Sequence, residues 1–133
     1  MMHKALVALA VCSMMNTALW AADCSKMESQ TDLTRCFNAE YEAVDKELNK
    51  VYTSYRSSLV DDRQRQDLSE VQRAWIKYRD LSCHFELSAS KGGSSYPMGL
   101  AMCLADKTRV RTDEIKKLAS CEEGDIACPP IIR

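Results

Sequence analysis

Cysteines are the feature that most constrains how this chain can fold. The sequence holds seven, and one of them, Cys12, lies in an apolar N-terminal segment. The other six cysteines form an even set, which in a small exported domain is typical of a disulfide framework. Their clustering along the chain favours local bridges. We therefore predict three pairs: Cys24 with Cys36, Cys83 with Cys103, and Cys121 with Cys128.

The N-terminal segment has the pattern of a secretory leader. Lys4 precedes a mostly apolar stretch over residues 5–20, and small residues follow. We predict a signal peptide over residues 1–22, removed by cleavage after Ala21 or Ala22. A retained anchor is the alternative, but polar residues interrupt a segment that is already short for a bilayer. The sequence thus predicts a secreted or periplasmic protein without a stable membrane anchor after cleavage.

Two long segments have helical spacing. From Phe37 to Leu59, apolar residues recur at steps of three and four, and Thr31 or Asp32 can cap the start of this helix. A short polar turn leads to a second helix over about residues 62–88, which must run antiparallel to the first. The residues expected on its inner side are Leu68, Val71, Trp75, Tyr78 or Arg79, Ser82 or Cys83, and Phe85.

A third helix is predicted over about residues 100–120. Its inner stripe consists of Leu104, Thr108, Arg111, Ile115 and Leu118. Before it, residues 88–99 gather glycines, serines and a proline, a composition that predicts a loop. The expected fold class is all-α: an antiparallel three-helix bundle over residues 23–120, stapled by disulfides, with a disulfide-closed tail over residues 121–133.

Several polar residues share helical faces with expected core residues. Burying such groups costs free energy unless they are paired. We interpret them as a structural cluster of hydrogen bonds between helices, with Arg79 or Arg111 bound to Asp45 and Trp75 as the apolar anchor. Gln72 and Asn49 are expected to bond to each other or to the backbone. A polar pocket for a ligand is the alternative. The cluster contains Asp45, Asn49, Tyr52, Gln72, Trp75, Arg79, Thr108 and Arg111.

The sequence offers no convincing catalytic or metal site. It has no CxxC spacing, and His84 is the one histidine outside the leader, so neither a zinc site nor a Cys–His nucleophile pair is supported. Gly92 and Gly93 are not followed by the Lys and Ser or Thr of a phosphate-binding loop. Removal of Lys4 with the leader shifts the balance of 18 basic and 19 acidic residues slightly further to the acidic side, which argues against nucleic-acid binding. We expect no enzyme activity and no cofactor.

The motifs together resemble a known family of bacterial exported domains, the LprI-like lysozyme inhibitor N-terminal domains. The resemblance rests on the early cysteine pair, on LN-x-x-Y ending at Tyr52, and on Q-x-x-W-x-x-x-R-x-x-x-C from Gln72 to Cys83. The glycine loop KGGSS, Cys103, and T-x-x-R from Thr108 to Arg111 complete it. The resemblance implies a helical exported domain. For the protein after which the family is named, it implies inhibition of lysozyme.

Such a resemblance predicts a protein partner, with a lysozyme-type cell-wall hydrolase as the candidate. Inhibition would then work by occlusion, with an exposed loop entering the cleft of the enzyme and excluding substrate. The candidate partner-binding loop, held at its base by the expected Cys83–Cys103 bridge, consists of Lys91, Gly92, Gly93, Ser94, Ser95 and Tyr96. The alternatives are an envelope structural or assembly factor, and a toxin-immunity protein without lysozyme inhibition.

Overall fold

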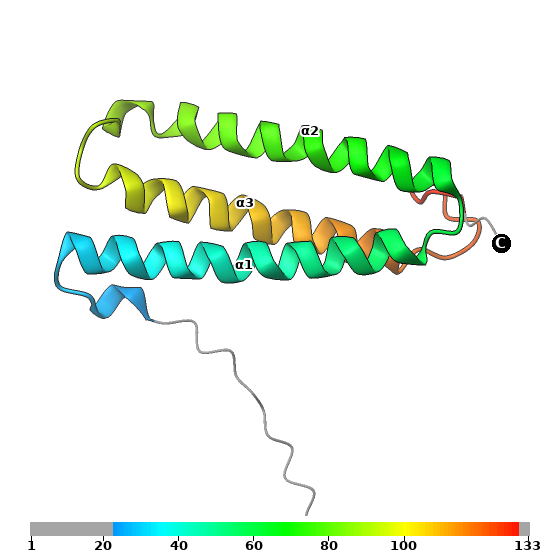
Figure 1. The fold of residues 1–133 in the computed structure, drawn as a ribbon, viewed down its shortest axis with the longest axis horizontal. Helices are drawn as coiled ribbons and strands as arrows, with labels where there is room; N and C mark the ends of the chain where they lie inside the picture. Colours follow the sequence, from blue (N-terminus) through cyan, green and yellow to red (C-terminus); the bar gives the residue numbers. More distant parts are fainter. Residues whose placement is uncertain (1–22, 131–133) are drawn as a thin grey trace, which may run out of the picture.

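The computed structural model describes residues 23–130, and all regular secondary structure in that range is helical, with no strand. A short 3-10 helix, η1 (Cys24–Lys26), precedes three long helices, α1 (Gln30–Ser58), α2 (Asp62–Glu86) and α3 (Tyr96–Ala119). A second 3-10 helix, η2 (Ser88–Ser90), lies between α2 and α3. The predicted antiparallel three-helix bundle is confirmed (Figure 1). The predicted signal peptide lies outside the described residues.

Side-chain caps determine where the first two long helices begin. Ser29 caps α1 by accepting a hydrogen bond from the backbone N–H of Asp32, and its hydroxyl donates to the Asp32 carboxylate. The predicted caps, Thr31 and Asp32, are therefore wrong, and Asp32 supports the cap from within the first turn. Asp61 caps α2 by accepting the N–H of Gln64 at 2.8 Å.

The third long helix begins four residues earlier than the glycine-rich composition predicts. Pro97 occupies its first turn, where a missing backbone N–H costs nothing and the fixed φ favours helix. Gly99 lies close to Leu87, so that a Cβ at this position would meet the Leu87 side chain at 3.2 Å. The loop between η2 and α3 is therefore confined to residues 91–95.

Side-chain size explains the spacing of the helices. On α3, small residues face α1, and Ala101, Ala105 and Thr112 are all buried. The two helices consequently lie side by side, whereas α2 forms a separate layer (Figure 1). Large side chains fill the space between this layer and the other two helices. The apolar core consists of Leu48, Tyr55, Leu68 and Ile115, with Val51, Tyr52, Leu59, Trp75 and Leu118 packed against it.

The inner face of α2 differs in part from the prediction. Arg79 and Cys83 are buried, but Val71, Tyr78 and Phe85 are 53%, 63% and 79% exposed. A helix at the surface of a bundle packs one face against its neighbours. In α2 this buried face consists of Leu68, Gln72, Arg79 and Cys83. The expected core positions Val71 and Phe85 are therefore wrong, and of the two alternatives Tyr78 or Arg79 the structure buries Arg79.

All three predicted disulfides are present. Cys24–Cys36 fastens η1 to α1, and Cys83–Cys103 joins α2 to α3 with its Cα atoms 5.8 Å apart. Cys121–Cys128 closes the C-terminal tail, and the Gln64 side chain donates a hydrogen bond to the backbone oxygen of Pro130. Within residues 23–130, none of the helices combines the length and the hydropathy needed to cross a bilayer.

Candidate functional site

Arg79 is the centre of the polar cluster between the helices. Its side chain is 8% exposed and donates from Nη1 to Asp45 Oδ1 at 3.2 Å and to Thr108 Oγ1 at 3.3 Å. Its Nε donates to Asp80 at 2.9 Å. Burial lowers the pKa of Arg79, but the bonds to Asp80 and Asp45 outweigh this effect and raise the pKa overall. One guanidinium thus links all three long helices.

Aromatic rings cover this guanidinium and that of Arg111. The Arg79 carbon Cζ lies 5.2 Å from the Trp75 ring centre and 5.5 Å from that of Tyr41. Arg111 Cζ lies 5.8 Å from the Trp75 ring. Cation–π attraction is stronger for a desolvated cation, so Trp75 stabilises two buried charges at once. This arrangement explains why a tryptophan is the apolar anchor of the cluster.

The other predicted members pair differently from the expectation. Gln72 accepts a hydrogen bond from Arg111 Nε at 3.0 Å and makes none with Asn49, whose amide donates to Asp45 at 3.1 Å. Tyr52 donates to Ser69 on α2 at 3.0 Å. Every predicted cluster residue except Asn49, whose bond stays within α1, thus takes part in helix-to-helix packing or hydrogen bonding. These hydrogen bonds favour the structural interpretation over a ligand pocket, although Arg111 also lines a groove of about 530 Å³ and its Nη2 is buried without a hydrogen-bond partner.

Burial makes the tyrosine beside this cluster harder to ionise. Desolvation raises the pKa of Tyr41, and the nearby Arg79 charge offsets it only in part. A folded-state pKa above the unfolded value contributes stability below about pH 10 that is lost as pH rises through the folded pKa. We expect Tyr41→Phe to flatten the alkaline loss of unfolding free energy in urea titrations. An unchanged slope would contradict this assignment.

Beyond the C-terminal end of α2, the predicted partner-binding loop is a series of hydrogen-bonded turns. The N–H of Lys91 donates to Ser88 O, that of Gly93 to Ser90 O, and that of Tyr96 to Gly93 O. Gly92 has φ of +86°, a conformation that favours glycine. Residues 91–95 are nevertheless all exposed. The loop is therefore ordered by its own backbone and accessible to a partner.

Tyr96, the last residue of the predicted loop, belongs instead to the first turn of α3. It is half-buried, and its hydroxyl lies 2.7 Å from Nδ1 of His84 on α2. The two rings are stacked, with centres 6.5 Å apart. Tyr96 thus fixes the start of α3 to the last turns of α2, below the loop.

The base of the loop is braced by charge as well as by the disulfide. Lys107 Nζ on α3 lies 2.9 Å from Glu86 Oε1, at the end of α2. The hydrogen bond from Lys107 lowers the pKa of Glu86, and the same bond raises the pKa of Lys107. Together with the Cys83–Cys103 bridge, this pair holds the two helix ends that carry the loop.

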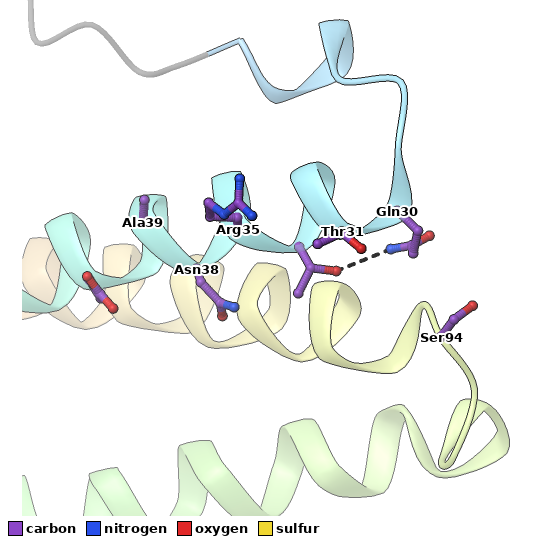
Figure 2. Close-up of a pocket in the computed structure, with 8 residues that line it drawn as sticks. Gln30, Thr31, Arg35, Asn38, Ala39 and Ser94 are labelled. Atoms are coloured by element: carbon purple, nitrogen blue, oxygen red, sulfur yellow. Dashed lines mark hydrogen bonds between the residues drawn. The ribbon is translucent and has the colours of Figure 1, made fainter.

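A polar groove of about 560 Å³ lies beside the loop, between Ser94 and the first turns of α1. In Figure 2, Ser94 stands across from Gln30 and Thr31, with Arg35, Asn38 and Ala39 following along α1. Gln30 donates from Nε2 to Thr34 Oγ1 at 3.3 Å. The lining amides, hydroxyls and guanidinium can bind polar groups of a partner.

The α1 side of this groove was not predicted. Residues such as Gln30, Thr34 and Asn38 share no spacing that distinguishes them from any solvated helix surface. They acquire a common role only because the fold brings Ser94 to them. The structure thus assembles a candidate site, the loop with its adjacent groove, and within residues 23–130 it contains no cluster of side chains that could hold a metal ion.

Comparisons with known proteins agree with this architecture. The family described as Lysozyme inhibitor LprI matches residues 21–115. An uncharacterized protein of Rhizobium meliloti, R02472, is 39% identical over 114 residues, which cover 77% of this chain and 82% of the relative. No solved structure matches.

Proposed function

Because this chain belongs to the LprI family of lysozyme inhibitors, we propose that it inhibits a lysozyme-type cell-wall hydrolase by occluding the substrate cleft. The observation that carries the proposal is the loop of residues 91–95, which is exposed yet held by backbone hydrogen bonds and a disulfide at its base. Such preorganisation reduces the entropy lost on binding. The three disulfides fit an exported protein, and we place its action in the periplasm or outside the cell.

The chemistry of the loop suits such a cleft. Glycoside hydrolases generally act through two carboxyl groups that flank the scissile bond. Lys91 supplies an exposed cation at the start of the loop, and its neighbours are glycines and serines, which are small enough to enter a cleft. The loop itself offers no reactive group to be processed. Inhibition therefore consists of exclusion of the polysaccharide, with no covalent step.

The direct test is lysis of bacterial cell walls by lysozyme, followed as loss of turbidity, with and without the purified protein. Deletion of Gly93–Ser95 should abolish inhibition while the far-ultraviolet circular dichroism stays helical. Unchanged inhibition by the deletion variant would rule out the loop. No inhibition and no complex with the wild-type chain would remove the proposed function.

A charge reversal tests the role of Lys91 with less disturbance of the backbone. Lys91→Glu should weaken inhibition about tenfold or more, since an added carboxylate would face those of the cleft and like charges oppose binding. Lys117→Glu is the matched control, because this lysine is also exposed but lies in the last turn of α3, at the other end of the bundle. Equal effects of the two reversals would contradict a specific contact.

A further inference from the structure

The outer side of α2 carries an apolar stripe that the bundle does not use. We define the α2 stripe as Val71, Ala74, Tyr78, Leu81 and Phe85, which follow one another at steps of three, four, three and four. All five are exposed, and Leu81 is 59% and Phe85 79% accessible to solvent. A regular apolar seam of this spacing is the pattern by which one helix packs against another.

No described element covers this seam. The buried residues of α2 lie along a different line of the helix, and at 3.6 residues per turn the centre of the stripe is rotated by roughly 120° from theirs. Two neighbours reach its edge: Lys107 Nζ lies 5.9 Å from the Tyr78 ring centre, and Val71 lines a groove together with Pro129 and Pro130 of the tail. In Figure 1, α2 forms an outer layer of the bundle, and nothing lies on its side away from α1 and α3.

We propose that a second copy of this chain covers the α2 stripe, with the two α2 helices antiparallel. The stripe tapers, since Val71 and Ala74 near its start are small whereas Tyr78, Leu81 and Phe85 toward its end are large. An antiparallel copy places Phe85 and Leu81 opposite the small residues of the other copy at both ends of the seam, and the two Tyr78 rings meet at its centre. A symmetric pair of this kind uses the same patch twice, as two-fold interfaces do.

Charges beside the stripe also depend on the orientation. On its outer flank, Glu70 lies near the narrow end and His84 near the wide end, with Lys77 between them at steps of seven. An antiparallel pair brings the Glu70 carboxylate toward the His84 imidazole of the other copy at two places, and Lys77 toward Lys77 at one. A parallel pair keeps Glu70 and the His84 of the other copy roughly 20 Å apart along the axis, since each residue of a helix rises 1.5 Å.

The size of the seam indicates a weak dimer. With aromatic side chains of roughly 200 Å² each, the stripe exposes on the order of 500 Å² per copy. The pair would bury about 1,000 Å² in total, which is near the lower limit for a specific interface. We therefore expect a dissociation constant of about 1 to 100 µM.

Sedimentation velocity of the purified, oxidised protein over this concentration range tests the proposal. The wild type should shift from monomer to dimer, and Tyr78→Glu and Leu81→Glu should remain monomeric with unchanged melting temperatures, since both side chains are exposed. Val110→Glu is the matched control on α3, where Val110 is 59% exposed outside the stripe, and it should dimerise like the wild type. A wild type that stays monomeric, or stripe variants that still dimerise, would overturn the proposal.

The orientation has its own test. Glu70→Lys should weaken an antiparallel dimer at least threefold, because it sets a cation beside His84 of the second copy. In a parallel dimer Glu70 lies far from His84 of the second copy, so an unaffected dissociation constant would overturn the antiparallel arrangement.

Discussion

Replacing Arg79 with Met should lower the free energy of unfolding by about 3 kcal/mol, the range expected when one partner of a buried ionic network is removed. Methionine has similar length and fits a core, but it donates no hydrogen bond. Thr108 Oγ1, which is fully buried, would lose the bond from Arg79. Asp45 would lose its cation, and the Trp75 and Tyr41 rings would lose the charge beside them.

Thermal unfolding followed by circular dichroism measures this effect, with an expected decrease in melting temperature of roughly 10 to 20 °C. Arg109→Met is the matched control, because Arg109 pairs with Glu40 and Asp106 while its side chain is 43% exposed. Exposed ion pairs contribute about 1 kcal/mol or less. If the two variants melted alike, the cluster around Arg79 would not be the buried network described above.

The same experiment separates structure from function at this cluster. Because the cluster lies inside the bundle, the folded fraction of Arg79→Met should still inhibit the hydrolase. Lost inhibition in a fully folded sample would instead support the alternative interpretation of the cluster as a ligand pocket.

Local features of the sequence account for most of the fold. The paired cysteines lie 12, 20 and 7 residues apart, so their order along the chain already indicates the bridges. Steps of three and four locate the helices, and Asp61 marks the beginning of α2 through its cap. These signals depend on neighbouring residues, which is why they can be identified before the fold is known.

The face that α2 turns inward could not be predicted from hydropathy. The helix carries two stripes, and the more apolar one, through Val71, Tyr78 and Phe85, is the exposed one. The buried stripe contains Gln72 and Arg79, whose burial is favourable only because Asp45, Thr108 and Arg111 of other helices pair with them. Such long-range pairing depends on the assembled bundle.

The groove at the candidate site is non-local for the same reason. Ser94 and the α1 residues of the groove are more than 50 residues apart in the sequence, and no pattern in either segment indicates the other. The loop could be predicted from its glycines, but the start of α3 at Tyr96 depends on Pro97 and on the contact of Tyr96 with His84. Composition alone therefore assigns residues 96–99 to the loop, although they form the first turn of α3.

Removing the Cys83–Cys103 bridge should have the second large effect, on stability and on inhibition together. For two cysteines 20 residues apart, the chain-entropy model gives about 3 kcal/mol of lost stability for the double variant Cys83→Ala, Cys103→Ala. The bridge also holds the helix ends that carry residues 91–95. Without it, binding must order the loop ends as well, and inhibition should weaken about tenfold.

The tail bridge provides the control for this prediction. Cys121 and Cys128 are 7 residues apart, so the double alanine variant should lose only about 2 kcal/mol by the same model. It should keep full inhibition, because the tail lies at the end of the bundle away from the loop (Figure 1). Both variants are compared below their melting temperatures, where circular dichroism shows each to be folded. Full inhibition by the folded Cys83→Ala, Cys103→Ala variant would mean that the bridge stabilises the bundle without preorganising the loop, and the occlusion mechanism would lose its main structural support.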